Sequence, residues 1–179
     1  MREIVKAGSI VAKWWPQCTD STDRRKGGRP QGRAVRVLQG AGAALRVAMP
    51  EMKLDPFERV DDTPFALSKE ALLRDRGEPW RALRNDVGLN EMDYGDVVYR
   101  FQDCGRLEEI TLQAEVLSIG NLAVPFACLA AFVRAHDPAA FERAGFLVSP
   151  GFGLAFDPSE PSWVTALARH CLPQWKRLS

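Results

Sequence analysis

Hydrophobic and polar residues alternate most regularly in the middle of the chain. Residues 96–101 read DVVYRF, with Val97 and Tyr99 on one side of the pattern, and residues 109–116 repeat the alternation over a longer stretch. The intervening sequence Asp103-Cys104-Gly105 is typical of a tight turn. The pattern predicts an antiparallel hairpin with one face on the core and the other face in water.

Other stretches have the 3.6-residue hydrophobic period of a helix. Ser68 can cap a short helix that ends at Gly77, and residues 125–136 predict a helix that faces the core. Asp137 followed by proline has the form of a helix start and predicts a second short helix up to Gly145. The last predicted helix covers residues 162–171, whose apolar face consists of Trp163, Leu167 and Cys171.

Turn signals complete the predicted order of elements. Gly120-Asn121 marks a turn after the longer strand, and residues 146–149 and 152–156 flank Pro150-Gly151 as a further hairpin. The predicted order is therefore α-β-β-(β)-α-α-β-β-α. This order predicts the α+β class, with helices packed on an antiparallel sheet.

Charge divides the chain near residue 50. Residues 1–50 contain ten Lys and Arg against three Asp and Glu, whereas residues 51–179 contain fourteen against twenty and carry a net charge of −6. The first part is rich in Gly and Arg and has too little apolar surface to offset its ordering entropy. We predict a basic, poorly structured leader over 1–50 and a single acidic domain over 51–179.

The leader allows three interpretations. Trp14 and Trp15 would anchor an amphipathic targeting segment. Alternatively, the leader is a dispensable tail or the product of a misassigned start, because Met49 and Met52 lie at the compositional break. In the third interpretation it is a nucleic-acid arm, in which phosphates are neutralised by Arg24, Arg25, Lys26, Arg29 and Arg33.

The sequence argues against several classes of protein. It has no run of about 18 apolar residues to cross a membrane, and its start lacks the pattern of a signal peptide. The four cysteines are far apart, which favours reduced thiols in the cytoplasm over a zinc or CxxC redox site. The acidic domain has the wrong sign of charge for nucleic acid. We predict neither a metal nor a cofactor, because the acidic residues lack ligand spacing.

Catalytic chemistry has one candidate centre, His170. The adjacent Cys171 would point about 100° away from it on a helix, so a Cys–His pair would need Cys104 or Cys128 from elsewhere in the fold. The neighbouring Glu108 and Glu109 should point to opposite faces of their strand. Three tryptophans are candidates for either packing or ligand stacking, namely Trp80, Trp163 and Trp175.

Two stretches resemble the small immunity proteins of bacterial toxin–immunity systems. The sequence VSPGFGLAFDPSEPSWVTAL over 148–167 is similar to their closing segment, in which a strand with a Gly-Leu-x-Phe-Asp-Pro-like turn precedes a Val-Thr-Ala helix. The sequence DYGDVVYRFQDCGRLEEITLQ over 93–113 also resembles the sequences of these immunity proteins. Together they cover less than half of the acidic domain. The resemblance implies a cytoplasmic, non-catalytic protein that neutralises one toxin delivered by contact-dependent or type VI secretion.

An acidic inhibitor would be attracted electrostatically to a basic toxin such as a nuclease. We therefore expect a monomer that contacts its cognate toxin through carboxylates around the central hairpin, with an aromatic hot spot. The candidate contact residues are Trp80, Asp93, Tyr94, Asp96, Asp103, Glu108, Glu109 and Glu115.

Two alternatives remain open at this point. The acidic charge and the order of elements are also similar to those of secretion chaperones, which dimerise and hold an extended effector segment. A hydrolase with a site around His170 is the second alternative, and it requires a concave pocket with a perturbed titratable group. A dimer in solution would favour the chaperone, and a monomer the immunity protein.

Overall fold

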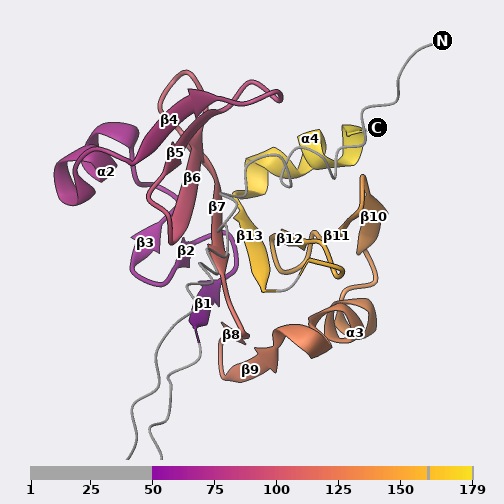
Figure 1. Cartoon of the computed structure of the whole chain (residues 1–179). Coiled ribbons are helices and arrows are strands. Elements are labelled where there is room, and N and C mark those ends of the chain that lie inside the picture. The colour runs from indigo at the N-terminus through magenta and orange to yellow at the C-terminus, as the bar shows by residue number, and fades with distance from the viewer. Residues whose placement is uncertain (1–49, 161, 179) are drawn as a thin grey trace, which may run out of the picture.

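The computed structural model describes residues 50–160 and 162–178, in which two β-sheets account for most of the secondary structure (Figure 1). The described residues contain thirteen strands, three short α-helices and one 3-10 helix. Apart from Pro50, the predicted basic leader lies outside the described residues.

The larger sheet has eight strands in the order β10-β11-β12-β13-β7-β6-β5-β4 and is antiparallel throughout. Its centre is the pairing of β13 with β7, which places Thr165 opposite Thr111. The strands are β4 (Arg81–Arg84), β5 (Asn90–Asp93), β6 (Val97–Phe101), β7 (Leu107–Gln113), β10 (Phe141–Arg143), β11 (Phe146–Ser149), β12 (Leu154–Phe156) and β13 (Trp163–Leu167).

The smaller sheet has five strands in the order β3-β2-β1-β8-β9. Its pairing of β1 with β8 is parallel and joins residues far apart in sequence, since Glu51 lies opposite Val116. The carbonyl of Pro50 also accepts the amide of Glu115 at 2.8 Å. The strands are β1 (Glu51–Asp55), β2 (Arg59–Val60), β3 (Thr63–Pro64), β8 (Val116–Ile119) and β9 (Leu122–Pro125).

The helices cover the sheets at separate places (Figure 1). Helix α2 (Lys69–Arg76) lies beside the β4–β6 part of the large sheet, and α3 (Phe126–His136) follows β9. The 3-10 helix η1 (Arg169–Cys171) leads from β13 into α4 (Leu172–Arg177), which covers the β10–β13 part.

Two hydrophobic cores lie on opposite faces of the large sheet. The larger core joins one face to the small sheet, α2 and α3, and includes Met52, Tyr99 and Leu129. The smaller core lies under α4, where Trp175 packs on Phe146 with ring centroids 5.5 Å apart. Strands between the two cores are therefore buried on both faces.

Several local predictions are confirmed. Strands β6 and β7 form the predicted hairpin around Gly105, and β11 and β12 form the hairpin around Pro150-Gly151. The predicted turn at Gly120-Asn121 joins β8 to β9. Both early helices form as predicted, and the Ser68 hydroxyl accepts the Ala71 amide at 3.2 Å.

The α+β assignment, with helices packed on one sheet in the predicted order, is wrong. Residues 163–167 form β13 instead of a helix, because Val164 and Ala166 face the larger core while Leu167 faces the smaller one. A strand buried on both faces has a continuous apolar run, which also fits a helix. The Val-Thr-Ala helix expected from the immunity-protein resemblance is thus a strand in this chain.

The helix predicted from Asp137 to Gly145 is also absent from the described residues. Asp137 ends α3, and its carboxylate accepts the Ala139 amide at 2.9 Å in a local turn that leads to β10. Asp side chains favour such turns as readily as helix starts. The prediction that one whole face of the central hairpin lies in water is wrong as well, since Thr111 on that face is buried.

Candidate functional site

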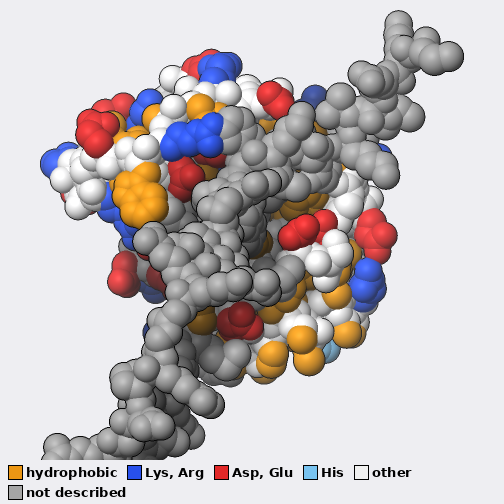
Figure 2. Space-filling model, in the orientation of Figure 1, with side chains coloured by type: hydrophobic (Ala, Val, Ile, Leu, Met, Phe, Trp, Pro, Cys, Tyr) orange, Lys and Arg blue, Asp and Glu red, His pale blue; other side chains and the backbone are white. Residues whose placement is uncertain are grey.

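The best candidate for a functional surface lies where the end of α2, the start of β4 and the β5–β6 turn meet. Four of the predicted contact residues come together there. Figure 2 shows acidic and basic side chains gathered over this part of the molecule. We call it the Trp80 surface and define it by Arg76, Trp80, Asp93, Tyr94, Gly95 and Asp96.

Trp80 is the most exposed large hydrophobic side chain among the described residues, with 85% of its surface accessible. It follows Pro79, whose ring restricts the backbone, and it immediately precedes β4. Exposed tryptophans are uncommon on a monomer and are enriched at binding hot spots. The position therefore offers an aromatic anchor to a partner.

Gly95 allows the indole of Trp80 to lie against the β5–β6 turn. A Cβ atom at this glycine would lie 2.7 Å from Cζ3 of Trp80, which is closer than carbon atoms approach one another. The backbone φ of Gly95 is also +89°, a conformation that favours glycine. The indole thus contacts the turn while most of its surface stays in solvent.

Tyr94 holds the surface together and is only partly exposed. Its hydroxyl donates to the Gly77 carbonyl at 2.9 Å, and its ring meets Tyr99 edge to face. Burial raises the pKa of the Tyr94 hydroxyl. The guanidinium of Arg76 lies 5.6 Å from the centroids of both tyrosine rings. Tyr94 therefore fixes the β5–β6 turn to the end of α2.

Two carboxylates flank Gly95, against which the tryptophan lies. Asp93 Oδ1 accepts the Gly95 amide at 2.7 Å, which places this carboxylate at the residue that supports the indole. Asp96 Oδ1 lies 3.8 Å from Nη1 of Arg76 in an exposed ion pair. Arg76 and Gly95 are not among the predicted contact residues, although the Asp-Tyr-Gly-Asp sequence signals a turn that needs a glycine.

Asp103 lies away from this surface, in the β6–β7 turn. Its carboxylate accepts from both terminal nitrogens of Arg84 and from the Asn90 side chain, the latter at 3.0 Å. The hydrogen bonds from Arg84 and then Asn90 lower the pKa of Asp103. Glu115 is also separate, because it accepts the Ser162 hydroxyl at 2.9 Å beyond the far end of β7.

Glu108 and Glu109 point to opposite faces of β7, as predicted, but neither is available as a contact residue. The side chain of Glu108 is fully buried, and its Oε1 accepts from Arg106 at 3.1 Å and lies 2.9 Å from Nε2 of His170. Within the part of the chain that the structure describes, Oε2 of Glu108 has no hydrogen-bond partner. The prediction that this carboxylate faces a partner fails because the β13–η1 junction covers it.

Glu109 belongs to an internal polar network on the other face. It accepts the indole N–H of Trp175 at 2.9 Å and lies 3.4 Å from Arg100, which also binds Glu91 at 2.8 Å. Arg100 donates further to the Thr111 hydroxyl at 2.6 Å. Burial raises the pKa of Glu109, against the opposing effect of Arg100.

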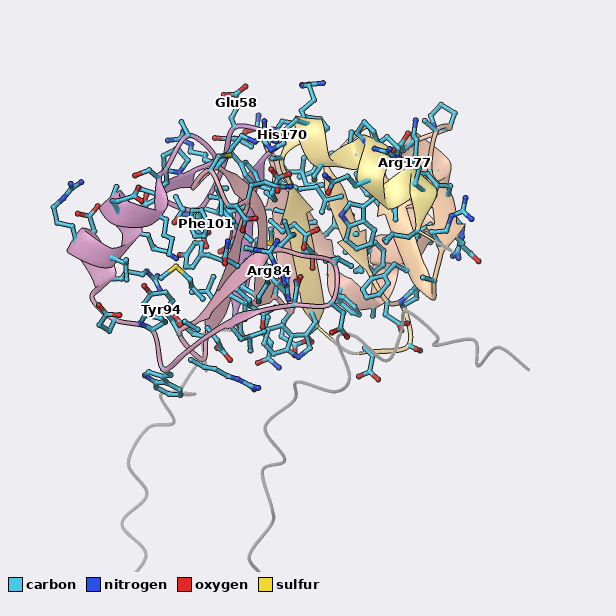
Figure 3. All side chains as sticks on the ribbon, turned by 90° about the horizontal axis from the view of Figure 1, so that it is seen from above. Glu58, Arg84, Tyr94, Phe101, His170 and Arg177 are labelled. Atoms are coloured by element: carbon cyan, nitrogen blue, oxygen red, sulfur yellow. The ribbon has the colours of Figure 1, made fainter. Side chains whose placement is uncertain are left out.

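The hydrolase alternative depends on His170, which lies apart from Tyr94 in Figure 3. The structure places a carboxylate oxygen of Glu108 2.9 Å from Nε2 of this histidine. Cys171 is buried, and burial raises the pKa of its thiol, so the thiol is protonated and is not a ready nucleophile. Trp80 and Trp175 do not form one stacking set, because Trp175 is buried in the smaller core.

Within residues 50–160 and 162–178, no group of three or more His, Cys, Asp or Glu side chains could hold a metal ion. None of the helices in this same part of the chain has the length and apolar character needed to cross a membrane. Comparisons with protein-family models, curated proteins and solved structures find no significant match to this chain.

Proposed function

We propose that this protein is a non-catalytic, cytoplasmic inhibitor that neutralises a cognate bacterial toxin by binding it through the Trp80 surface. The observation that carries the proposal is the 85% exposed indole of Trp80, which lies against a turn flanked by two carboxylates. Binding hot spots are enriched in tryptophan, and they are most effective when the anchor is already ordered before association. Trp80 meets the first condition, and its contact with Gly95 favours the second.

Charge supports a basic partner. Residues 51–179 carry a net charge of −6, so a basic toxin such as a nuclease would be attracted over long distances. Asp93 and Asp96 add negative charge next to the proposed anchor. The resemblance of residues 93–113 to immunity proteins would imply the same class of partner.

The proposal is tested by immobilising the full chain and exposing it to a lysate of the organism that encodes it. We expect one basic protein to be retained stoichiometrically and to be toxic when expressed alone. Co-expression of this chain should suppress that toxicity. The Trp80→Ala variant should bind the isolated toxin at least roughly 30-fold more weakly, as expected for a hot-spot residue.

Leu122→Ala is the matched control, because Leu122 is also an exposed hydrophobic residue but lies on β9 of the small sheet. It should bind the toxin as the wild type does. Equal binding by the wild type and Trp80→Ala would contradict the assignment of this surface. Retention of a toxin that the chain fails to silence would contradict the inhibitory function.

The chaperone alternative differs in its oligomeric state. Sedimentation equilibrium of the full chain should show a monomer for the proposed inhibitor. A stable dimer that binds an extended, unfolded effector segment would favour the secretion chaperone instead. The hydrolase alternative would be favoured by a hydrolytic activity that is lost in His170→Ala and retained in Trp80→Ala.

A further inference from the structure

The exposed face of the Trp80 indole is open to a chemical group of the toxin. We propose that the Trp80 surface receives an arginine side chain, whose guanidinium stacks on the indole and pairs with Asp93 or Asp96. This inference rests on the proposed function and names the group of the partner that the surface would recognise.

The indole is suited to a planar cation. A guanidinium near the face of a tryptophan is attracted by the negative potential of the ring, and tryptophan is the best of the aromatic residues for this contact. Gly95 lies against the benzene ring of the indole, and the side chain remains 85% exposed. A second planar group therefore has room to stack without displacing protein atoms.

The carboxylates favour the same ligand. Asp93 Oδ1 is held 2.7 Å from the amide of Gly95, the residue on which the indole rests. Asp96 directly follows Gly95 in the chain. Its Oδ1 lies 3.8 Å from Nη1 of Arg76, which is a long and therefore weak ion pair. A guanidinium that stacks on the indole can donate in its own plane to a carboxylate, whereas an ammonium ion lacks this planar fork.

The chain uses arginine–aromatic stacking elsewhere. Arg169 lies 4.0 Å from the centroid of the Phe57 ring, and Arg76 lies over Tyr94. In the described part of the chain, no Arg or Lys lies over the ring of Trp80. Trp80, the one highly exposed indole among the described residues, thus has the chemistry for this contact with its exposed side open to a partner.

The inference is tested by nuclear magnetic resonance of the full chain labelled with nitrogen-15. The indole cross-peak of Trp80 is assigned by its loss in Trp80→Phe. The probes are ethylguanidinium, ethylammonium and N-ethylurea at constant ionic strength and below denaturing concentrations. We expect a saturable shift of the Trp80 cross-peak with ethylguanidinium, roughly two- to five-fold weaker binding of ethylammonium, and no saturable shift with N-ethylurea.

The double variant Asp93→Asn with Asp96→Asn should weaken ethylguanidinium binding roughly two- to five-fold. The matched control is Asp61→Asn with Asp62→Asn, an acidic pair beside β2 and β3 of the small sheet, which should leave binding unchanged. An equal response of the Trp80 cross-peak to ethylguanidinium and N-ethylurea would overturn the inference. An unchanged affinity in the Asp93 and Asp96 variant would overturn the role of the carboxylates.

These outcomes are separable from those of the toxin experiment. If Trp80→Ala abolishes toxin binding while ethylguanidinium gives no selective shift, the surface is a docking site but its partner group is not a guanidinium. If ethylguanidinium binds selectively while no toxin is neutralised, the arginine site stands and the inhibitory function fails.

Discussion

Asp137 provides the sharpest test of how this fold is held together. Its carboxylate is buried at the end of α3 and joins that helix to the β11–β12 turn. Oδ2 accepts from the Ser149 hydroxyl at 2.5 Å and from the Gly151 amide at 2.7 Å, while Oδ1 accepts the Ala139 amide at 2.9 Å. We predict that Asp137→Asn destabilises the folded state.

The expected loss is about 2–3 kcal/mol at neutral pH, because hydrogen bonds to an ionised acceptor contribute about 1.5–3 kcal/mol and the new amide group faces donors. For a domain of this size the melting temperature should fall by roughly 6–15 °C. Burial alone would raise the pKa of Asp137, but the hydrogen bonds from Ser149, Gly151 and Ala139 outweigh it and lower the pKa.

The lowered pKa also predicts how the effect depends on pH. Because the folded state binds the proton less tightly than the unfolded chain, the stabilisation by Asp137 is complete above the unfolded pKa of about 3.9. It is lost as the pH falls through the lower, folded value. The stability difference between the wild type and Asp137→Asn should therefore shrink as the pH is lowered from about 7 to about 3.

Urea denaturation followed by circular dichroism at several pH values measures both quantities. The exposed Asp86→Asn serves as a control and should change stability by less than about 0.5 kcal/mol. A destabilisation by Asp137→Asn no larger than that of the control would refute the reasoning. A difference that stays constant down to about pH 3 would refute the role of the ionised carboxylate.

Three further predictions address the core, the polar network and the cysteines. Leu154→Ala, at a fully buried position, should cost about 3–4 kcal/mol in urea denaturation, and a loss below about 1 kcal/mol would contradict the described packing. Trp175→Phe removes the indole donor to Glu109 and should lower the free energy of unfolding by about 1–2 kcal/mol. Because the donor stabilises the ionised carboxylate, this loss should grow as the pH rises through the raised pKa of Glu109. A thiol reagent should modify the exposed Cys104 in the folded protein but reach Cys171 only after unfolding, and mass spectrometry of the labelled peptides checks this.

The elements that can be predicted from the sequence are those specified by local signals. Alternation and a turn glycine identify the hairpin of β6 and β7, and a serine cap with Gly77 as the terminator identifies α2. Such signals act over a few residues and do not depend on the rest of the fold. The small sheet depends instead on the long-range pairing of β1 with β8, which no local pattern specifies.

β13 shows why a strand that is buried on both faces cannot be predicted from local signals. Its five residues pack on both cores, so the alternation that normally identifies a strand is absent. The helical spacing of Trp163 and Leu167 then favours a helix, which gives the wrong fold class. The β-branched pair Val164 and Thr165 is the available signal for a strand.

The candidate site is predictable in part. Residue type identifies Trp80, Asp93, Tyr94 and Asp96, and the fold brings these four side chains to one place. The burial of Glu108 and Glu109 cannot be read from the alternating pattern, because α4 and η1 cover both sides of the start of β7. The prediction of these two glutamates as surface carboxylates is therefore wrong.

The parallel pairing of β1 with β8 has a consequence for synthesis of the chain. β1 is made first among the described strands and its antiparallel partner β2 follows at once, yet its parallel partner β8 is not completed until Ile119 has been added. During that interval the other edge of β1 is unpaired, and Met52 and Leu54, which are buried in the finished fold, lack the later residues of the larger core. Because long-range pairing is slow and nascent chains fold from the N-terminus, the newborn chain should carry β1 with one unpaired edge and exposed apolar side chains. A chaperone that binds such strands on the ribosome would have its natural target there.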